Sequence, residues 1–133
     1  MTSSFEALVP EGRRALFDAH GYSAATRVGE LLFVSGQVGV DAEGRVVEDP
    51  RAQVDQAFRN LVQVLELAGA GPSEVVKLTV FAVGLEAHFE TFLEVKSRYF
   101  GAPPFPALTG VEVAGLAMAG LVVEIEAVAS LRS

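Results

Sequence analysis

The clearest structural signal in this chain comes from Phe105-Pro106-Ala107-Leu108-Thr109-Gly110-Val111-Glu112-Val113, together with Val123-Glu124-Ile125-Glu126-Ala127-Val128-Ala129. Both segments have strand character, and a pleated backbone sends alternate side chains to opposite faces of a sheet. Ile125 and Ala127 therefore share one face of the second segment, while Glu124 and Glu126 share the other. Two carboxylates on an otherwise apolar strand are costly if they are buried without partners, and useful if a cleft lies beside them.

The length and composition are those of one compact domain. The chain has 133 residues, half of them hydrophobic, so we expect a single domain over residues 1–133. Its net charge is −7 and its basic residues are scattered, which argues against a nucleic-acid partner. The absence of cysteine excludes disulfide bonds, thiolate metal sites and a cysteine nucleophile.

The sequence predicts neither export nor membrane insertion. Residues 1–7 lack the basic and apolar regions of a secretory signal. The longest uncharged apolar run, 113–123, is far shorter than the roughly 20 residues that cross a bilayer. We expect a cytoplasmic protein without a membrane partner.

His20 and His88 lie far apart without ligand spacing, so no metal site is predicted.

A hairpin and a capped helix are predicted in the first half of the chain, after a weakly patterned stretch over residues 1–20. The hairpin has strands over 25–28 and 31–35, and Gly36-Gln37 should end the second strand. Asp49-Pro50 is typical of an N-cap followed by proline in the first helical position. An apolar stripe follows, and Gly69 offers a stop for the helix.

A strand and a second helix are predicted before the two segments quoted above. The strand spans 74–83, which is rich in valine, threonine and phenylalanine. The helix spans 86–100, with one face made of Phe89, Phe92, Leu93 and Lys96. Strands separated by whole helices favour an α+β sheet with its helices on one face. The other face, carrying Glu124 and Glu126, is too apolar for water and too charged for a core, so we expect it to associate with other copies.

Five motifs in order resemble the Rid family of reactive intermediate deaminases, also called perchloric-acid-soluble or endoribonuclease L-PSP proteins. The similarity runs from about residue 20 to residue 130 and rests on Gly21-Tyr22-Ser23, 34–38, 75–81, 105–107 and 123–129. It implies a chorismate-mutase-like protomer, with a mixed sheet covered by two helices on one face, assembled as a homotrimer. In typical members, clefts between the subunits bind a small metabolite and hydrolyse 2-imino or 2-enamino acids to 2-keto acids and ammonia. No metal or cofactor is implied.

The resemblance assigns roles to Glu124, Tyr22 and Ser35. Glu124 matches the glutamate that positions or activates water, whereas the residues alone allow a solvated or ion-paired strand glutamate. Tyr22 matches a cleft tyrosine, and the alternative is a half-buried aromatic at a strand start. Ser35 could donate a hydrogen bond in the cleft, or it could cap its own turn. Glu126 is interpreted as a structural partner of Lys77 or of a neighbouring subunit.

The chain departs from the family where substrate binds. The resemblance places Leu108, Thr109 and Gly110 in the cleft, but typical deaminating members have arginine where Leu108 stands. That arginine holds the substrate carboxylate in a bidentate pair, which leucine cannot do. Leu93 replaces a family asparagine, and the 115–120 loop is apolar and about one residue longer than usual.

Three functions remain open from the sequence. The first is an imine or enamine hydrolase with shifted specificity, in which Arg27 or Arg98 could replace the missing guanidinium. The second is a non-catalytic ligand-binding or regulatory trimer. The third, a ribonuclease or translation inhibitor, is disfavoured by the acidic charge.

Overall fold

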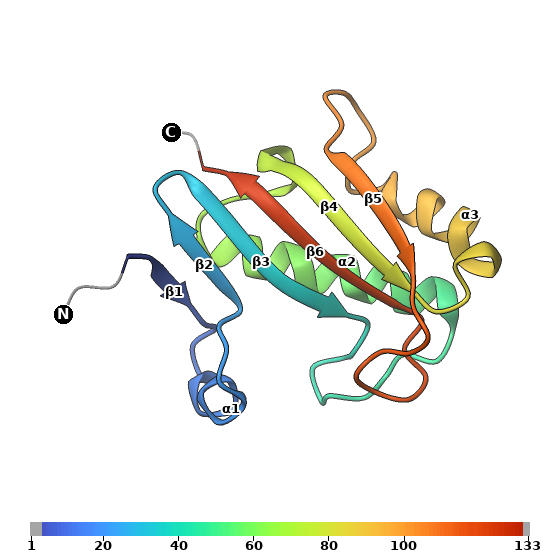
Figure 1. Cartoon of the computed structure of the whole chain (residues 1–133), viewed down its shortest axis with the longest axis horizontal. Coiled ribbons are helices and arrows are strands. Elements are labelled where there is room, and N and C mark those ends of the chain that lie inside the picture. The colour runs from blue at the N-terminus through green and yellow to red at the C-terminus, as the bar shows by residue number, and fades with distance from the viewer. Residues whose placement is uncertain (1–3, 132–133) are drawn as a thin grey trace.

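A computed structural model describes residues 4–131 and places a six-stranded sheet at the centre of the molecule (Figure 1). The strands lie in the order β1-β2-β3-β6-β4-β5, so β1 and β5 form the two edges. All neighbouring strands are antiparallel except β4 and β5, which makes the sheet mixed. The strands are β1 (Glu6–Leu8), β2 (Ala25–Val28), β3 (Leu31–Val38), β4 (Val75–Ala82), β5 (Ala107–Glu112) and β6 (Val123–Ser130).

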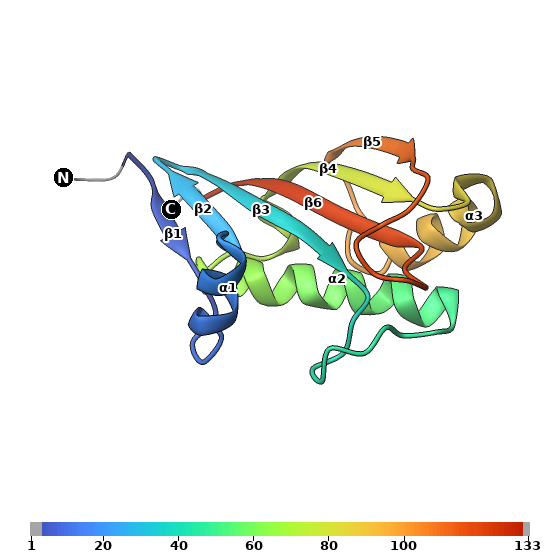
Figure 2. The same cartoon turned by 60° about the horizontal axis from the view of Figure 1, so that its bottom comes forward.

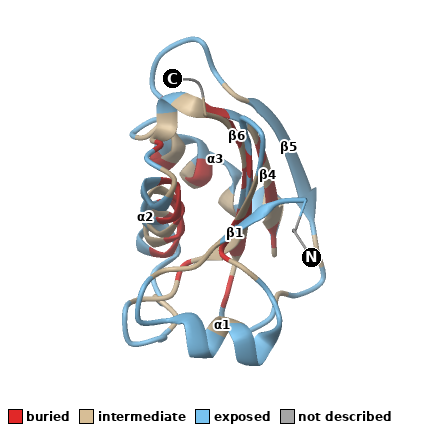
Figure 3. Ribbon diagram, turned by 90° about the vertical axis from the view of Figure 1, so that its left-hand side faces the viewer, coloured by how far each residue is buried: buried red, intermediate tan, exposed pale blue. Residues whose placement is uncertain are grey.

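Two helices, α2 (Pro50–Leu67) and α3 (Leu85–Lys96), cover one face of this sheet (Figure 2). The short helix α1 (Arg14–His20) lies near the edge formed by β1 and β2, and a 3₁₀ turn (Pro72–Glu74) precedes β4. The buried residues lie mainly where α2 and the sheet face each other (Figure 3). The predicted α+β architecture is confirmed. Over residues 4–131, none of the helices combines the length and apolar character needed to cross a membrane.

The start and end of α2 follow from the residues predicted to cap it. The Asp49 side chain accepts a hydrogen bond from the Ala52 backbone N–H at 3.0 Å, which satisfies a donor that the helix leaves free. Pro50 occupies the first turn, where its missing N–H costs nothing. Gly69 follows the helix with φ of 71°, a conformation that glycine adopts readily.

The predicted end of the hairpin at Gly36-Gln37 is wrong. Strand β3 continues to Val38, and its register with β6 shifts between Val34 and Gln37, which marks a β-bulge. A Cβ atom at position 36 would collide with the carboxylate of Glu124. Gly36 therefore allows the Glu124 side chain to approach the backbone closely and does not terminate the strand.

The predicted face and end of the second helix are also wrong in part. Helix α3 ends at Lys96, and its buried residues are Phe92 and Val95. Phe92 packs against Phe58 of α2, with ring centroids 5.5 Å apart. This packing turns Phe89 and Leu93, which were expected beside Phe92, towards an exposed flank.

The N-terminal stretch has more order than its sequence pattern suggests. Residues 6–8 pair with β2, and residues 14–20 form α1, which ends at Gly21 with φ of 74°. Helix α1 has no buried residue, so it carries no apolar stripe from which its period could be recognised.

Candidate functional site

Glu124 lies on the face of the sheet that no helix covers. Residues 123, 125, 127 and 129 of β6 are buried towards the helices, so Glu124 and Glu126 point the other way. In register, Glu124 lies opposite Phe81 of β4 and Val38 of β3. Its carboxylate covers Gly36 in the β-bulge. The sequence-based placement of both glutamates on one open face is confirmed.

The surroundings of Glu124 favour its protonated form. Partial burial raises the pKa of its carboxyl group above the ordinary value, and the negative charge of Glu126 raises it further. A carboxyl group that holds its proton closer to neutral pH can both donate and accept a proton during a reaction.

Ser35 positions the backbone that carries Tyr22. The Ser35 hydroxyl donates to the carbonyl oxygen of Ser23 at 2.7 Å. The Ser35 backbone N–H donates to the carbonyl oxygen of Ala24 at 3.0 Å. Tyr22 itself is 54% exposed and packs on Phe17, with ring centroids 4.8 Å apart. The Ser35 hydroxyl is thus engaged within its own protomer, and Tyr22 is open to a ligand.

A cavity of about 530 Å³ connects Tyr22 with the β-bulge. It is lined by Tyr22, Gly36, Gln37 and Asn60, among others, and reaches from α1 to α2. Asn60 donates to the carbonyl oxygens of Val38 and Val40 at 2.8 and 3.0 Å, which fixes the end of β3. The backbone beside Glu124 is therefore held from the helix side.

Gln53 is a positioning residue that the sequence analysis missed. Its fully buried amide donates to the carbonyl oxygens of Val47 and Gly120 at 2.9 and 3.0 Å. It also accepts the Val122 N–H at 2.6 Å, two residues before Glu124. A polar residue beside the apolar stripe of the predicted helix was the available signal.

Leu108, Thr109 and Gly110 lie on β5, at the edge of the sheet. Leu108 is in register with buried Leu78 and so points to the helix side, opposite to Glu124. Thr109 points to the open face, where its hydroxyl accepts a hydrogen bond from Lys77 Nζ. Within one protomer, the structure places Glu124 against Gly36 and leaves Leu108 on the other side of the sheet. Tyr22 shares a cavity with Gly36 on the side of α2.

The expected ion pair between Lys77 and Glu126 is not formed. Lys77 turns to Thr109 of β5, the strand next to its own, and no ion pair links it to Glu126 within residues 4–131. Glu126 lies opposite Thr79 of β4 and remains exposed on the open face.

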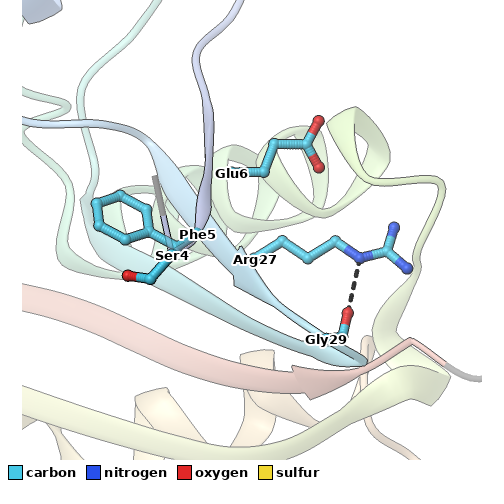
Figure 4. Close-up of a pocket in the computed structure, with 5 residues that line it drawn as sticks. All are labelled: Ser4, Phe5, Glu6, Arg27 and Gly29. Atoms are coloured by element: carbon cyan, nitrogen blue, oxygen red, sulfur yellow. Dashed lines mark hydrogen bonds between the residues drawn. The ribbon is translucent and has the colours of Figure 1, made fainter. Parts of the chain in front are cut away.

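Neither arginine considered as a substitute for the missing guanidinium lies beside Leu108. Arg27 is on β2, near the opposite edge, where its Nε donates to the Gly29 carbonyl oxygen at 2.9 Å (Figure 4). It lines a pocket of about 340 Å³ that also includes Ser4 and Glu6. Arg98 follows the end of α3 and lies 3.8 Å from Asp55, in an ion pair that joins this segment to α2.

The described part of the chain contains no group of three or more side chains suited to hold a metal ion. The ring Nδ1 of His20 lies 2.9 Å from the Leu16 carbonyl oxygen of its own helix. Of the three residues to which the resemblance assigns roles, Glu124 carries a carboxyl group, and Tyr22 and Ser35 carry hydroxyl groups.

Comparison with known proteins gives the family. The model of the family described as Endoribonuclease L-PSP matches residues 12–131, and the chain belongs to this family, as the Rid resemblance indicated. A relative in Escherichia coli K12, "RutC family protein YjgH", is 42% identical over 125 residues, covering 94% of each chain. The "2-iminobutanoate/2-iminopropanoate deaminase" of Dermatophagoides farinae is 37% identical over 97 residues, or 71% of this chain and 74% of that one.

The fold agrees with a solved structure of the same family. The structure described as "Structural Genomics, Protein YJGH" superposes with a TM-score of 0.88 at 40% identity, covering 98% of this chain and 99% of that one. Similarity of this extent includes the sheet, both covering helices and the N-terminal helix.

Proposed function

We propose that this protein hydrolyses an imine or enamine to a carbonyl compound and ammonia, in clefts between the subunits of a homotrimer. The observation that carries the proposal is the Glu124 carboxyl group, with its raised pKa, on an open sheet face directly beside Gly36. Family membership supports it, because a relative bears the name of an imine deaminase.

The placement of the residues supports a site shared between two copies. Leu108 and Glu124 point to opposite faces of one sheet, so a single protomer cannot present both to one ligand. The open face also exposes Phe33 and carries Phe81 and Val128, which favours burial against other copies. Association would then bring the β5 edge of one copy to the Glu124 region of another.

The reaction needs only water and a proton-transferring group. Protonated Glu124 donates to the imine nitrogen, which makes the imine carbon more electrophilic. Water adds to that carbon, and the Glu124 carboxylate takes up a proton from the attacking water. Glu124 then protonates the nitrogen of the resulting carbinolamine, the C–N bond breaks to release ammonia, and the hydroxyl group returns its proton to the Glu124 carboxylate as the C=O bond forms. Tyr22 packs against the substrate at the edge of the cleft.

Leu108 indicates a specificity different from that of a 2-imino acid deaminase. A leucine offers no donor to a carboxylate, so a carboxylate placed against it would lose water without gaining a hydrogen-bond partner. The same residue supports a second candidate, a ligand-binding trimer that kept the fold without the reaction. Release of ammonia from an imine separates the two. A ribonuclease role would require salt-dependent RNA binding, which the charge of −7 opposes.

The test is a pair of matched variants on β6. Glu124→Gln should lower kcat for imine hydrolysis by about 10²-fold or more, because the amide cannot transfer protons. Glu126→Gln, on the same face of the same strand, should keep activity within a few-fold. Ammonia release and light scattering would be measured for both. Equal activity of the Glu124→Gln variant and the wild type would overturn the proposed role.

A further inference from the structure

Four large apolar side chains are exposed where β5 and α3 meet. Phe89 is 42% exposed, Leu93 38%, Phe105 58% and Leu108 38%, and together we call them the apolar wall. Exposed hydrophobic side chains scattered singly are ordinary, but a group of this size on adjacent elements marks a contact surface. The apolar wall is distinct from the open sheet face, because Leu108 points to the helix side.

One contact joins a face of α3 to the segment that enters β5. Phe89, Leu93 and Lys96 follow one another at helical spacing, so they share a face of α3. The Lys96 ammonium lies 5.9 Å from the centroid of the Phe105 ring, so this face of α3 is turned to the segment that enters β5. Helix α3 runs beside β5 (Figure 1), and Leu108 projects from β5 towards the helix layer.

The charges around the apolar wall do not form an anion site. Lys96 is held over an aromatic ring, and the Glu112 carboxylate at the far end of β5 accepts the Leu85 N–H at 3.1 Å. Glu94 of α3 pairs with Arg51 of α2, away from β5. A carboxylate placed against Leu93 and Leu108 would lose water without gaining a bidentate partner, which is unfavourable.

We propose that the apolar wall selects an imine that has no carboxylate and carries an apolar substituent, of the kind formed when a primary amine is oxidised. This inference rests on the proposed hydrolase function and names the substrate class of the same cleft. The balanced reaction is RCH=NH + H₂O → RCHO + NH₃. Water adds across the C=N bond, and the C–N bond breaks with Glu124 returning the proton to nitrogen. The apolar substituent R packs on Leu93 and Leu108 of the partner copy.

A matched pair of imines tests this directly. An amino-acid oxidase acting on phenylalanine and an amine oxidase acting on phenethylamine form imines with the same benzyl group, with and without a carboxylate. Semicarbazide traps the imine that escapes hydrolysis, so the protein lowers the yield of the trapped product. We expect kcat/KM for the neutral imine to exceed that for the imino acid by about tenfold or more.

Variants of two leucines give the control. Leu108→Arg should reverse the preference, whereas Leu16→Arg, at a 46% exposed leucine on α1, should leave it unchanged. Light scattering would check that both variants assemble like the wild type. The Leu93→Asn substitution gives a second, milder change in the apolar wall. Equal rates for the two imines would overturn the inference while the hydrolase function stands. A preference for the imino acid that the Lys96→Met substitution removes would do the same. Hydrolysis of neither imine would overturn the function as well.

Discussion

At the scale of single residues, the raised pKa of Glu124 has a consequence for stability. A carboxyl group whose pKa is higher in the folded protein binds its proton more tightly there than in the unfolded chain, where the value is about 4.3. Its contribution to stability is present below the unfolded pKa and is lost as the pH rises through the folded pKa.

Glu124→Gln should therefore raise the free energy of unfolding relative to the wild type at pH 7, and by much less at about pH 4. Urea unfolding at the two pH values measures the difference. Glu90→Gln, at an exposed position on α3, serves as the control for removing one surface carboxylate. A stabilisation by Glu124→Gln that is equal at both pH values would show that burial does not raise this pKa.

Leu108 provides the second prediction at this scale. Wild-type protein should hydrolyse 2-aminoacrylate-type imino acids poorly, and Leu108→Arg should increase the rate. A charge-assisted bidentate contact is worth about 1.5–3 kcal/mol, which corresponds to about one to two orders of magnitude. Adding Glu124→Ala should abolish the increase. If Leu108→Arg gave no gain, the cleft would have diverged beyond this position, as expected of a ligand-binding protein.

The sequence predicted the residues of the site unevenly. Glu124 could be placed on an open face because strand alternation is a local property. The hydrogen bond of Ser35 reaches back to Ser23, and that of Gln53 reaches forward to Val122. Such contacts depend on how distant segments pack, so no spacing along the chain reveals them.

At the scale of secondary-structure elements, Gln53 joins α2 to the segment that leads into this helix, through Val47, and to the segment that leads into β6, through Gly120 and Val122. Gln53→Leu would leave the carbonyl oxygens of Val47 and Gly120 and the N–H of Val122 without their partners. Each buried unsatisfied group costs about 1–3 kcal/mol, so we expect a loss of about 3 kcal/mol or more in the free energy of unfolding.

The matched control for Gln53→Leu lies on the same helix. Gln63 is exposed, and Gln63→Leu should change stability by less than about 0.5 kcal/mol. Urea unfolding at neutral pH compares the two variants. A Gln53→Leu variant as stable as Gln63→Leu would mean that water satisfies these backbone groups.

Elements with a strong internal pattern were predictable, and those shaped by contacts were not. Helix α2 has its own cap and apolar stripe, and β6 alternates throughout. By contrast, β3 passes through Gly36 because the Glu124 carboxylate occupies the space of a side chain there. The face that α3 buries depends on its packing against Phe58 of α2. The sequence of α3 alone therefore does not reveal which face is buried.

At the scale of the whole molecule, the open sheet face should bring three copies together. Light scattering at micromolar concentration should give three times the protomer mass of 14.0 kDa. Phe33→Glu should shift the mass towards the monomer, because it places a charge on this apolar face. A monomer mass for the wild type would contradict the assembly and, with it, a cleft between copies.

The sequence alone predicts association through the uncovered face, but not which residues would meet there. Which residues meet depends on how the strands are paired. Leu108 is in register with buried Leu78 and points to the helix side, while Glu124 points to the opposite face. The separation of these two residues within a protomer is the structural reason to look for a site shared between copies.

Subunit mixing tests the shared site most directly. Glu124→Gln and Leu108→Arg chains, each impaired on an imine that the wild type hydrolyses, would be refolded together in equal amounts. A cleft with Glu124 from one copy and Leu108 from another should be intact in about one quarter of random combinations, so about a quarter of the wild-type activity should return. Activity that stays at the average of the two variants would contradict a cleft built from two copies.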